Sequence, residues 1–219
     1  MFQRMFLSAL WSFLLCITAL GQEAVKDLEA KLQQNPNDVA TLVLLGKTFH
    51  DRGTAGDEDA VDKGFPYLDK ALQLDPSNAV ALAYRGSLWT MRGRDAWWPF
   101  TKMNHVEKGI DELDKAVEMA PDIVEVRITR GINSMFLPSM FKRHATAMKD
   151  FAYLLKHPGF SHFPAPLQST IYCWSGIAFK QDNQIDRAKE LLGKAMAAAP
   201  DSDTARKANE ELKTLGETK

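Results

Sequence analysis

Apolar side chains recur every three or four residues along most of this chain, which is the spacing of an amphipathic helix. The pattern is clearest from residue 167 to residue 202, where two apolar runs flank a polar stretch at residues 181–183. That stretch reads Gln-Asp-Asn and favours a turn, because such side chains hydrogen-bond to the nearby backbone. Pro200 closes the second run because proline cannot continue a helix. We therefore predict two antiparallel helices joined by a turn.

Small residues stand where these two predicted helices would touch. Gly176 lies on the first helix and Ala188 on the second, and both allow the two backbones to approach closely. The bulky side chains of Tyr172, Phe179 and Leu192 fill the space that remains between the helices.

Three looser copies of this unit precede it. We place the four repeats at about residues 39–78, 79–122, 123–160 and 167–202. Each first helix keeps a glycine at the equivalent place, and a proline follows each second helix. The positions that define the repeats are Gly46, Ala71, Gly86, Ala116, Gly131, Phe151, Gly176, Ala188 and Ala195.

The spacing of Tyr172, Ser175, Gly176 and Phe179 resembles the W-x2-L-G-x2-Y pattern of the tetratricopeptide repeat (TPR) family. The second helix continues with the family's A-x3-F-x2-A-x4-P pattern, beginning at Ala188. The resemblance implies an all-α solenoid of about four antiparallel helix pairs, with a concave face that binds a peptide or partner segment.

The resemblance also implies which residues of the first helices face inward. They are Val43, Lys47, Ala83, Ser87, Ile128, Ile132, Cys173 and Ile177. The best-known members of the family clamp a terminal carboxylate with lysines and asparagines on this face. One lysine and no asparagine make a poor clamp, so we do not carry that activity over.

Helices are also predicted at both ends of the repeats. Residues 22–34 carry apolar side chains at helical spacing, and the break at residues 35–38 supplies a cap for the next helix. Residues 203–216 read as a capping helix with one polar face, as the end of a repeat array requires. We expect residues 22–219 to form a single domain.

Repeats one to three depart from the compact spacing. The distance from Gly46 to Gly64, and from Gly86 to Gly109, exceeds the distance from Gly176 to Ala188. We expect the extra residues to form long loops after the first helices. In repeat three, Pro138 is expected to end the first helix and begin an apolar loop.

The insertion in repeat two is the most apolar of these segments because it contains Trp97, Trp98 and Phe100. An exposed cluster of this kind promotes aggregation unless something covers it. The first interpretation is that the loop folds back on the helices as a plug. The alternatives are an anchor for a protein partner and a contact with a membrane surface, of which we do not favour the second. The candidate binding residues are Trp97, Trp98, Phe100, Ile128, Ile132, Met135 and Phe136.

Repeats two and three share an arginine before the glycine, Arg85 and Arg130. We expect each arginine to bind a carboxylate of a neighbouring loop, with Asp95 as one partner, and so to stabilise the fold. Binding an anion in the groove is the alternative.

The first 21 residues differ from the rest of the chain. A short positive region at Arg4 precedes an almost wholly apolar stretch, which ends in a small-x-small site before Gln22. This order is typical of a secretory signal peptide, so we expect a periplasmic or secreted protein. Its removal would leave Cys173 as a lone thiol, with no internal disulfide.

Composition and motifs further restrict the possible classes of function. The formal net charge of −1 gives no indication of nucleic-acid binding. No metal or cofactor motif is present, and an enzyme built on Asp95, His105 and Glu107 would have no orienting spacing. We expect a non-enzymatic interaction module of the cell envelope with a protein or peptide partner. The alternative is a binding protein for a small apolar ligand, held in a closed pocket between the groove and the aromatic loops.

Overall fold

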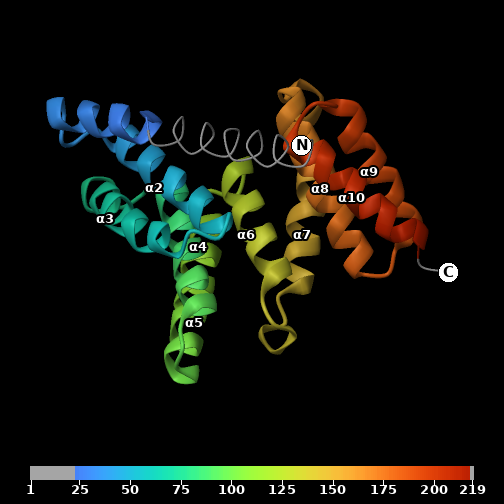
Figure 1. Ribbon diagram of the computed structural model, residues 1–219, viewed down its shortest axis with the longest axis horizontal. Helices are drawn as coiled ribbons and strands as arrows, with labels where there is room; N and C mark the ends of the chain where they lie inside the picture. The colour runs from blue at the N-terminus through green and yellow to red at the C-terminus, as the bar shows by residue number, and fades with distance from the viewer. Residues whose placement is uncertain (1–22, 218–219) are drawn as a thin grey trace, which may run out of the picture. The chain divides into compact units, whose positions relative to one another are not determined.

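The structure is a computed structural model that describes residues 23–217. Every regular element in that range is helical, which confirms the all-α prediction (Figure 1). The predicted signal peptide lies outside the described residues. The helices are residues 23–34, α2 (Val39–Thr54), α3 (Glu58–Leu74), α4 (Ala79–Asp95), α5 (Pro99–Met119), α6 (Val124–Phe136), α7 (His144–Leu155), α8 (Ala165–Gln181), α9 (Ile185–Ala198) and α10 (Asp203–Glu217).

The chain divides into two compact units between Glu112 and Leu113, inside α5. In the first unit, α2 pairs with α3 and α3 packs on α4. The helix of residues 23–34 contributes Val25 and Leu28 to a cluster around Leu45 and Phe49. It therefore covers the outer end of this unit, as its apolar stripe predicts.

Polar caps begin the helices of the first unit. Asp38, Asp57 and Asn78 each take extended backbone angles and accept a hydrogen bond from a backbone N–H of the following turn. These residues satisfy donors that would otherwise lack a partner at the start of a helix. The break at residues 35–38 thus supplies the cap that the sequence indicates.

The repeat glycines lie at close helix contacts. A β-carbon at Gly46 would come within 2.4 Å of Leu68 on α3, and one at Gly176 within 2.8 Å of Leu192 on α9. A β-carbon at Gly131 would meet the ring of Phe151 on α7 at 3.1 Å. Gly86 on α4 faces another glycine, Gly109 on α5. A β-carbon at Gly109 would lie 2.6 Å from the carbonyl oxygen of Gly86. All four therefore occupy matching places in successive pairs.

The long loops predicted for repeats one and two are wrong. α2 runs to Thr54 and α3 begins at Glu58, while α4 runs to Asp95 and α5 begins at Pro99. Each connection is therefore three residues long, as is the one between α8 and α9. The inserted residues lengthen both helices of each pair.

Two further glycines make these longer pairs fit. Gly53 and Gly93 each follow the repeat glycine by two helical turns and lie on the same helix face. A β-carbon would come within 2.8 Å of Val61 at the first and 2.6 Å of Val106 at the second. These glycines extend the close contact into the insertions.

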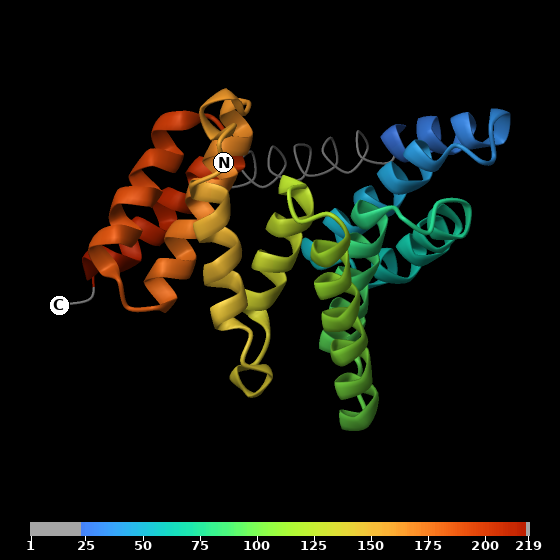
Figure 2. The same cartoon turned by 180° about the vertical axis from the view of Figure 1, so that it is seen from behind.

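The second unit contains α6 paired with α7, α8 paired with α9, and α10 packed on both α8 and α9 (Figure 1 and Figure 2). Its core includes Phe151, Ile171, Leu192 and Ala208. Within residues 23–217, this is the one pair in which a longer connection follows the first helix: α6 ends at Phe136, and residues 137–143 contain a single 3-10 turn before α7. The predicted capping helix is present as α10.

Candidate functional site

The turn between α4 and α5, residues 96–98, carries the largest exposed aromatic side chains in the described part of the first unit. Trp97 is 89% exposed and Trp98 53%, and Phe100 in the first turn of α5 is 75% exposed. The two tryptophan rings contact each other, with centroids 5.6 Å apart and planes inclined by 37°. The interpretation of this segment as a plug is therefore wrong.

The backbone explains why these rings stay outside. Trp98 precedes Pro99, which disfavours helical angles in the residue before it. Its carbonyl oxygen accepts the hydrogen bond from Lys102 N–H that starts α5, and Lys102 Nζ donates to the carbonyl of Arg94 at the end of α4. A three-residue turn tied to both helices has no length to fold back over the core. We call Trp97, Trp98 and Phe100 the aromatic turn.

An open cleft of about 580 Å³ lies beside the aromatic turn. The start of α3, the end of α4 and the start of α5 form its walls, all within the first unit. Its lining is Glu58, Asp59, Val61, Asp62, Arg92, Asp95, Ala96, Trp97, Trp98, Thr101 and His105. Four carboxylates and an open mouth do not suit the small apolar ligand of the alternative hypothesis, because ion desolvation would oppose binding.

The other predicted binding residues belong to the second unit. Ile128 and Ile132 are half-buried against its core, and Met135 is buried. Phe136 is exposed, and its ring meets Trp174 edge to face at 5.8 Å. The seven predicted residues are therefore divided between the two units.

The predicted concave groove is closed at four of its positions. Ala83 and Ser87 on α4 and Cys173 and Ile177 on α8 are all buried. α2 packs on α4, and α10 packs on α8. These positions lie at contacts between helices, so the expectation that they line an open groove is wrong.

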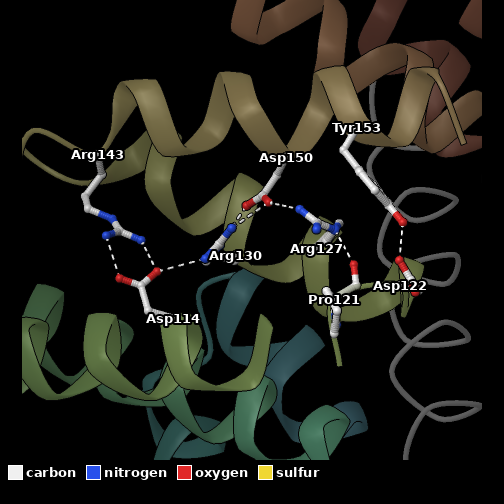
Figure 3. Close-up of polar contacts among 8 residues, drawn as sticks. All are labelled: Asp114, Pro121, Asp122, Arg127, Arg130, Arg143, Asp150 and Tyr153. Atoms are coloured by element: carbon white, nitrogen blue, oxygen red, sulfur yellow. Dashed lines mark hydrogen bonds and ion pairs between the residues drawn. The ribbon is translucent and has the colours of Figure 1, made fainter. Parts of the chain in front are cut away.

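The arginines of repeats two and three bind carboxylates, as predicted. These carboxylates lie on helices instead of loops, and Asp95 is not one of them. Arg85 donates to Glu112 and to Asp69, at 2.9 Å for the nearest atoms in each case. Arg130 donates through Nε and Nη2 to Asp150 at 2.8 and 2.7 Å, and through Nη1 to Asp114 (Figure 3). Asp95 instead accepts from Arg94.

Two more arginines, which the sequence pattern did not single out, join the second of these networks. Arg127 donates to Asp150 at 2.9 Å and lies over the Tyr153 ring, while Arg143 donates twice to Asp114 (Figure 3). Burial opposes the charge of Arg130, but its partners outweigh that effect and raise its pKa. A signal was present in the chain: an aspartate precedes Arg85 and Arg130 by the same interval, at Asp69 and Asp114.

The described residues bring together one serine, histidine and aspartate. His50 Nε2 lies 2.8 Å from Ser87 Oγ, and His50 Nδ1 lies 2.9 Å from Asp51. Nucleophilic catalysis needs a hydroxyl that a substrate can reach. Ser87 is completely buried, so this arrangement serves packing.

The remaining candidate chemistry is also internal. Burial raises the pKa of the Cys173 thiol to about 12, so the thiolate that would act as nucleophile is not formed at neutral pH. Among residues 23–217 no group of three or more potential ligands could hold a metal ion. None of the helices in this range has the length and apolar content needed to span a bilayer.

Comparison with solved structures identifies the fold. TTC0263, described as a thermophilic TPR protein of Thermus thermophilus, matches with a TM-score of 0.68 and 18% identity, over 90% of this chain and 93% of that one. MamA aligns with a TM-score of 0.47 and 21% identity, over 83% and 84% of the two chains. YrrB, described as a TPR protein with an unusual peptide-binding site, gives 0.38 and 17%, over 84% and 97%. No protein-family model and no curated protein matches the chain. The fold assignment rests on TTC0263.

Proposed function

Because this chain has the tetratricopeptide-repeat fold, we propose that it is a non-enzymatic interaction module that docks a protein or peptide partner. The amino-terminal pattern of a signal peptide supports placing that role in the cell envelope. A fold hosts many functions, so the proposal needs a site of its own. That site is the aromatic turn and the cleft beside it.

The exposure of the aromatic turn is the observation that carries this proposal. Tryptophan is the side chain most enriched at the energetic centres of interfaces, because a rigid ring buries a large area at little entropic cost. Trp97 keeps 89% of its surface in contact with solvent, so a partner could bury nearly all of it. The carboxylates of Glu58 and Asp59 in the same cleft would repel an anionic membrane, which favours a protein partner.

Site-specific photo-crosslinking tests the proposal. A benzophenone side chain at position 97 should form a defined crosslinked product in cells, because it occupies the partner-facing turn. The matched control carries the same group at Leu44, which is also exposed but lies outside the cleft. An equal yield of the same product from both positions, or no product from position 97, would contradict the proposal.

The variant Trp97→Ala/Trp98→Ala separates binding from folding. Both rings are largely outside the core, so we expect the melting temperature to change little. A benzophenone side chain at Thr101, which lines the same cleft, should crosslink the partner in the parent protein and no longer do so in this variant. A marked fall in melting temperature would show that the rings stabilise the fold instead.

A further inference from the structure

We propose that the cleft beside the aromatic turn holds an arginine side chain of the partner, with its guanidinium against Trp97 or Trp98 and paired with Glu58 and Asp59. This inference rests on the proposed function and specifies the partner's chemistry. The inference is based on two complementary features of the cleft, its aromatic faces and its carboxylates. The protein's own cations do not occupy all members of either set.

The other described tryptophans show how this chain treats an aromatic face. Lys108 Nζ lies 3.9 Å from the centroid of Trp89, and the Arg92 guanidinium lies 4.9 Å from the same ring. Lys207 Nζ lies 5.0 Å from the centroid of Trp174. These distances are typical of cation–π contacts.

Trp97 and Trp98 differ from that pattern. Within residues 23–217, these two rings contact each other and no further aromatic ring, and no cation lies over either of them. Both rings line the cleft. Their outer faces are therefore available to a cation from another molecule.

The carboxylates of the cleft divide into two classes. Asp62 is paired with Arg92, and Asp95 with Arg94. Glu58 and Asp59, in the first turn of α3, are exposed and form no salt bridge within residues 23–217, and the nearby charge of Arg94 acts on Glu58 without pairing with it. They remain available to balance an incoming positive charge.

Nearby groups preserve this negative character. His105 lines the same cleft, and burial together with the charges of Arg92 and Lys108 lowers its pKa, so the ring is neutral at pH 7. Arg92 pairs with Asp62, and its guanidinium lies over the Phe65 ring, 4.1 Å from the centroid. The charge of Arg92 is therefore already balanced by groups of the protein itself.

The geometry favours arginine over lysine. A guanidinium is planar, so it can stack on an indole face and at the same time donate a fork of hydrogen bonds to carboxylates. An ammonium is a compact and strongly hydrated charge that does not stack. A partner segment with an arginine is therefore a better fit than one with a lysine.

The test measures binding of a fluorescein-labelled peptide of glycine, serine and arginine to the purified protein by fluorescence anisotropy. The comparison peptides replace arginine by citrulline, which keeps the shape without the charge, or by lysine. We expect the arginine peptide to bind about tenfold more tightly than the citrulline peptide and to weaken as salt rises. Equal binding of the arginine and citrulline peptides would overturn the inference.

Variants locate the site. Glu58→Gln/Asp59→Asn, which leaves the cap Asp57 in place, and Trp97→Ala should each weaken arginine-peptide binding about three- to tenfold. The matched control Asp186→Asn/Asp201→Asn removes two exposed carboxylates far along the chain and should leave the affinity unchanged. Circular dichroism checks that each variant is folded. An equal loss in the control would show a nonspecific charge effect and refute the site.

The two proposals can fail separately. A crosslink from position 97 together with equal binding of the arginine and citrulline peptides would refute the arginine inference while the docking role stands. Absence of that crosslink would refute the docking role itself.

Discussion

Replacing Asp150 by asparagine is expected to destabilise the second unit strongly. Asp150 is completely buried and accepts hydrogen bonds from Arg127 and Arg130, which are themselves only 8% exposed (Figure 3). Asparagine has nearly the same shape, so the change creates no cavity. It removes the negative charge and turns one acceptor into a donor that faces guanidinium donors.

The expected loss follows from the burial of these groups. Removing one partner of a buried ion pair costs about 3–5 kcal/mol, because the remaining charge is left uncompensated away from water. An exposed pair contributes only about 0–1 kcal/mol. Arg130 keeps Asp114, but Arg143 shares that carboxylate. We therefore expect a loss of about 3–5 kcal/mol in the free energy of unfolding.

Urea unfolding followed by circular dichroism measures this loss. The triple variant Arg127→Met/Arg130→Met/Asp150→Leu provides the comparison. Replacing a whole buried network by apolar side chains is often neutral, so the triple variant should lose less stability than Asp150→Asn alone. A single-variant loss below about 1 kcal/mol, the value of an exposed pair, would refute the reasoning.

Three other predictions concern packing, ionisation and export. Gly93→Ala should cost about 1–3 kcal/mol by urea unfolding, because its new methyl group overlaps Val106, whereas Gly193→Ala, with nothing within 4 Å, should stabilise α9 by about 1 kcal/mol; equal effects would refute the close contact. In protein that begins at Gln22, maleimide should label Cys173 only after unfolding, and rapid labelling of the native protein would contradict its burial. Because the pKa of this thiol is about 12 when folded and near 9 when unfolded, its contribution to stability is present below pH 9 and declines above it. Mass spectrometry of the exported protein should find an amino terminus at or near Gln22, and retention of the first residues would exclude cleavage there.

The sequence by itself determined the local structure. Helical periodicity, caps such as Asp38 and the turn predicted at residues 181–183 depend on neighbouring residues, so they can be read without knowing what packs against them. The structure places that turn at residues 182–184, one residue later. Gly46 and Gly176 could be recognised as contact points because the repeat returns them at the same place in each unit. The first and last helices followed from the same rules.

The tertiary structure decided which of these residues meet. Gly53 and Gly93 look like loop residues in isolation, and only the partner helix shows that they permit two more turns of close packing. The partners of Arg85 and Arg130 lie on neighbouring helices, at sequence distances that no local pattern specifies. The exposure of a side chain depends on what surrounds it. The apolar composition of the segment led to the prediction that Trp97 is buried, but the short turn before Pro99 leaves it exposed to solvent.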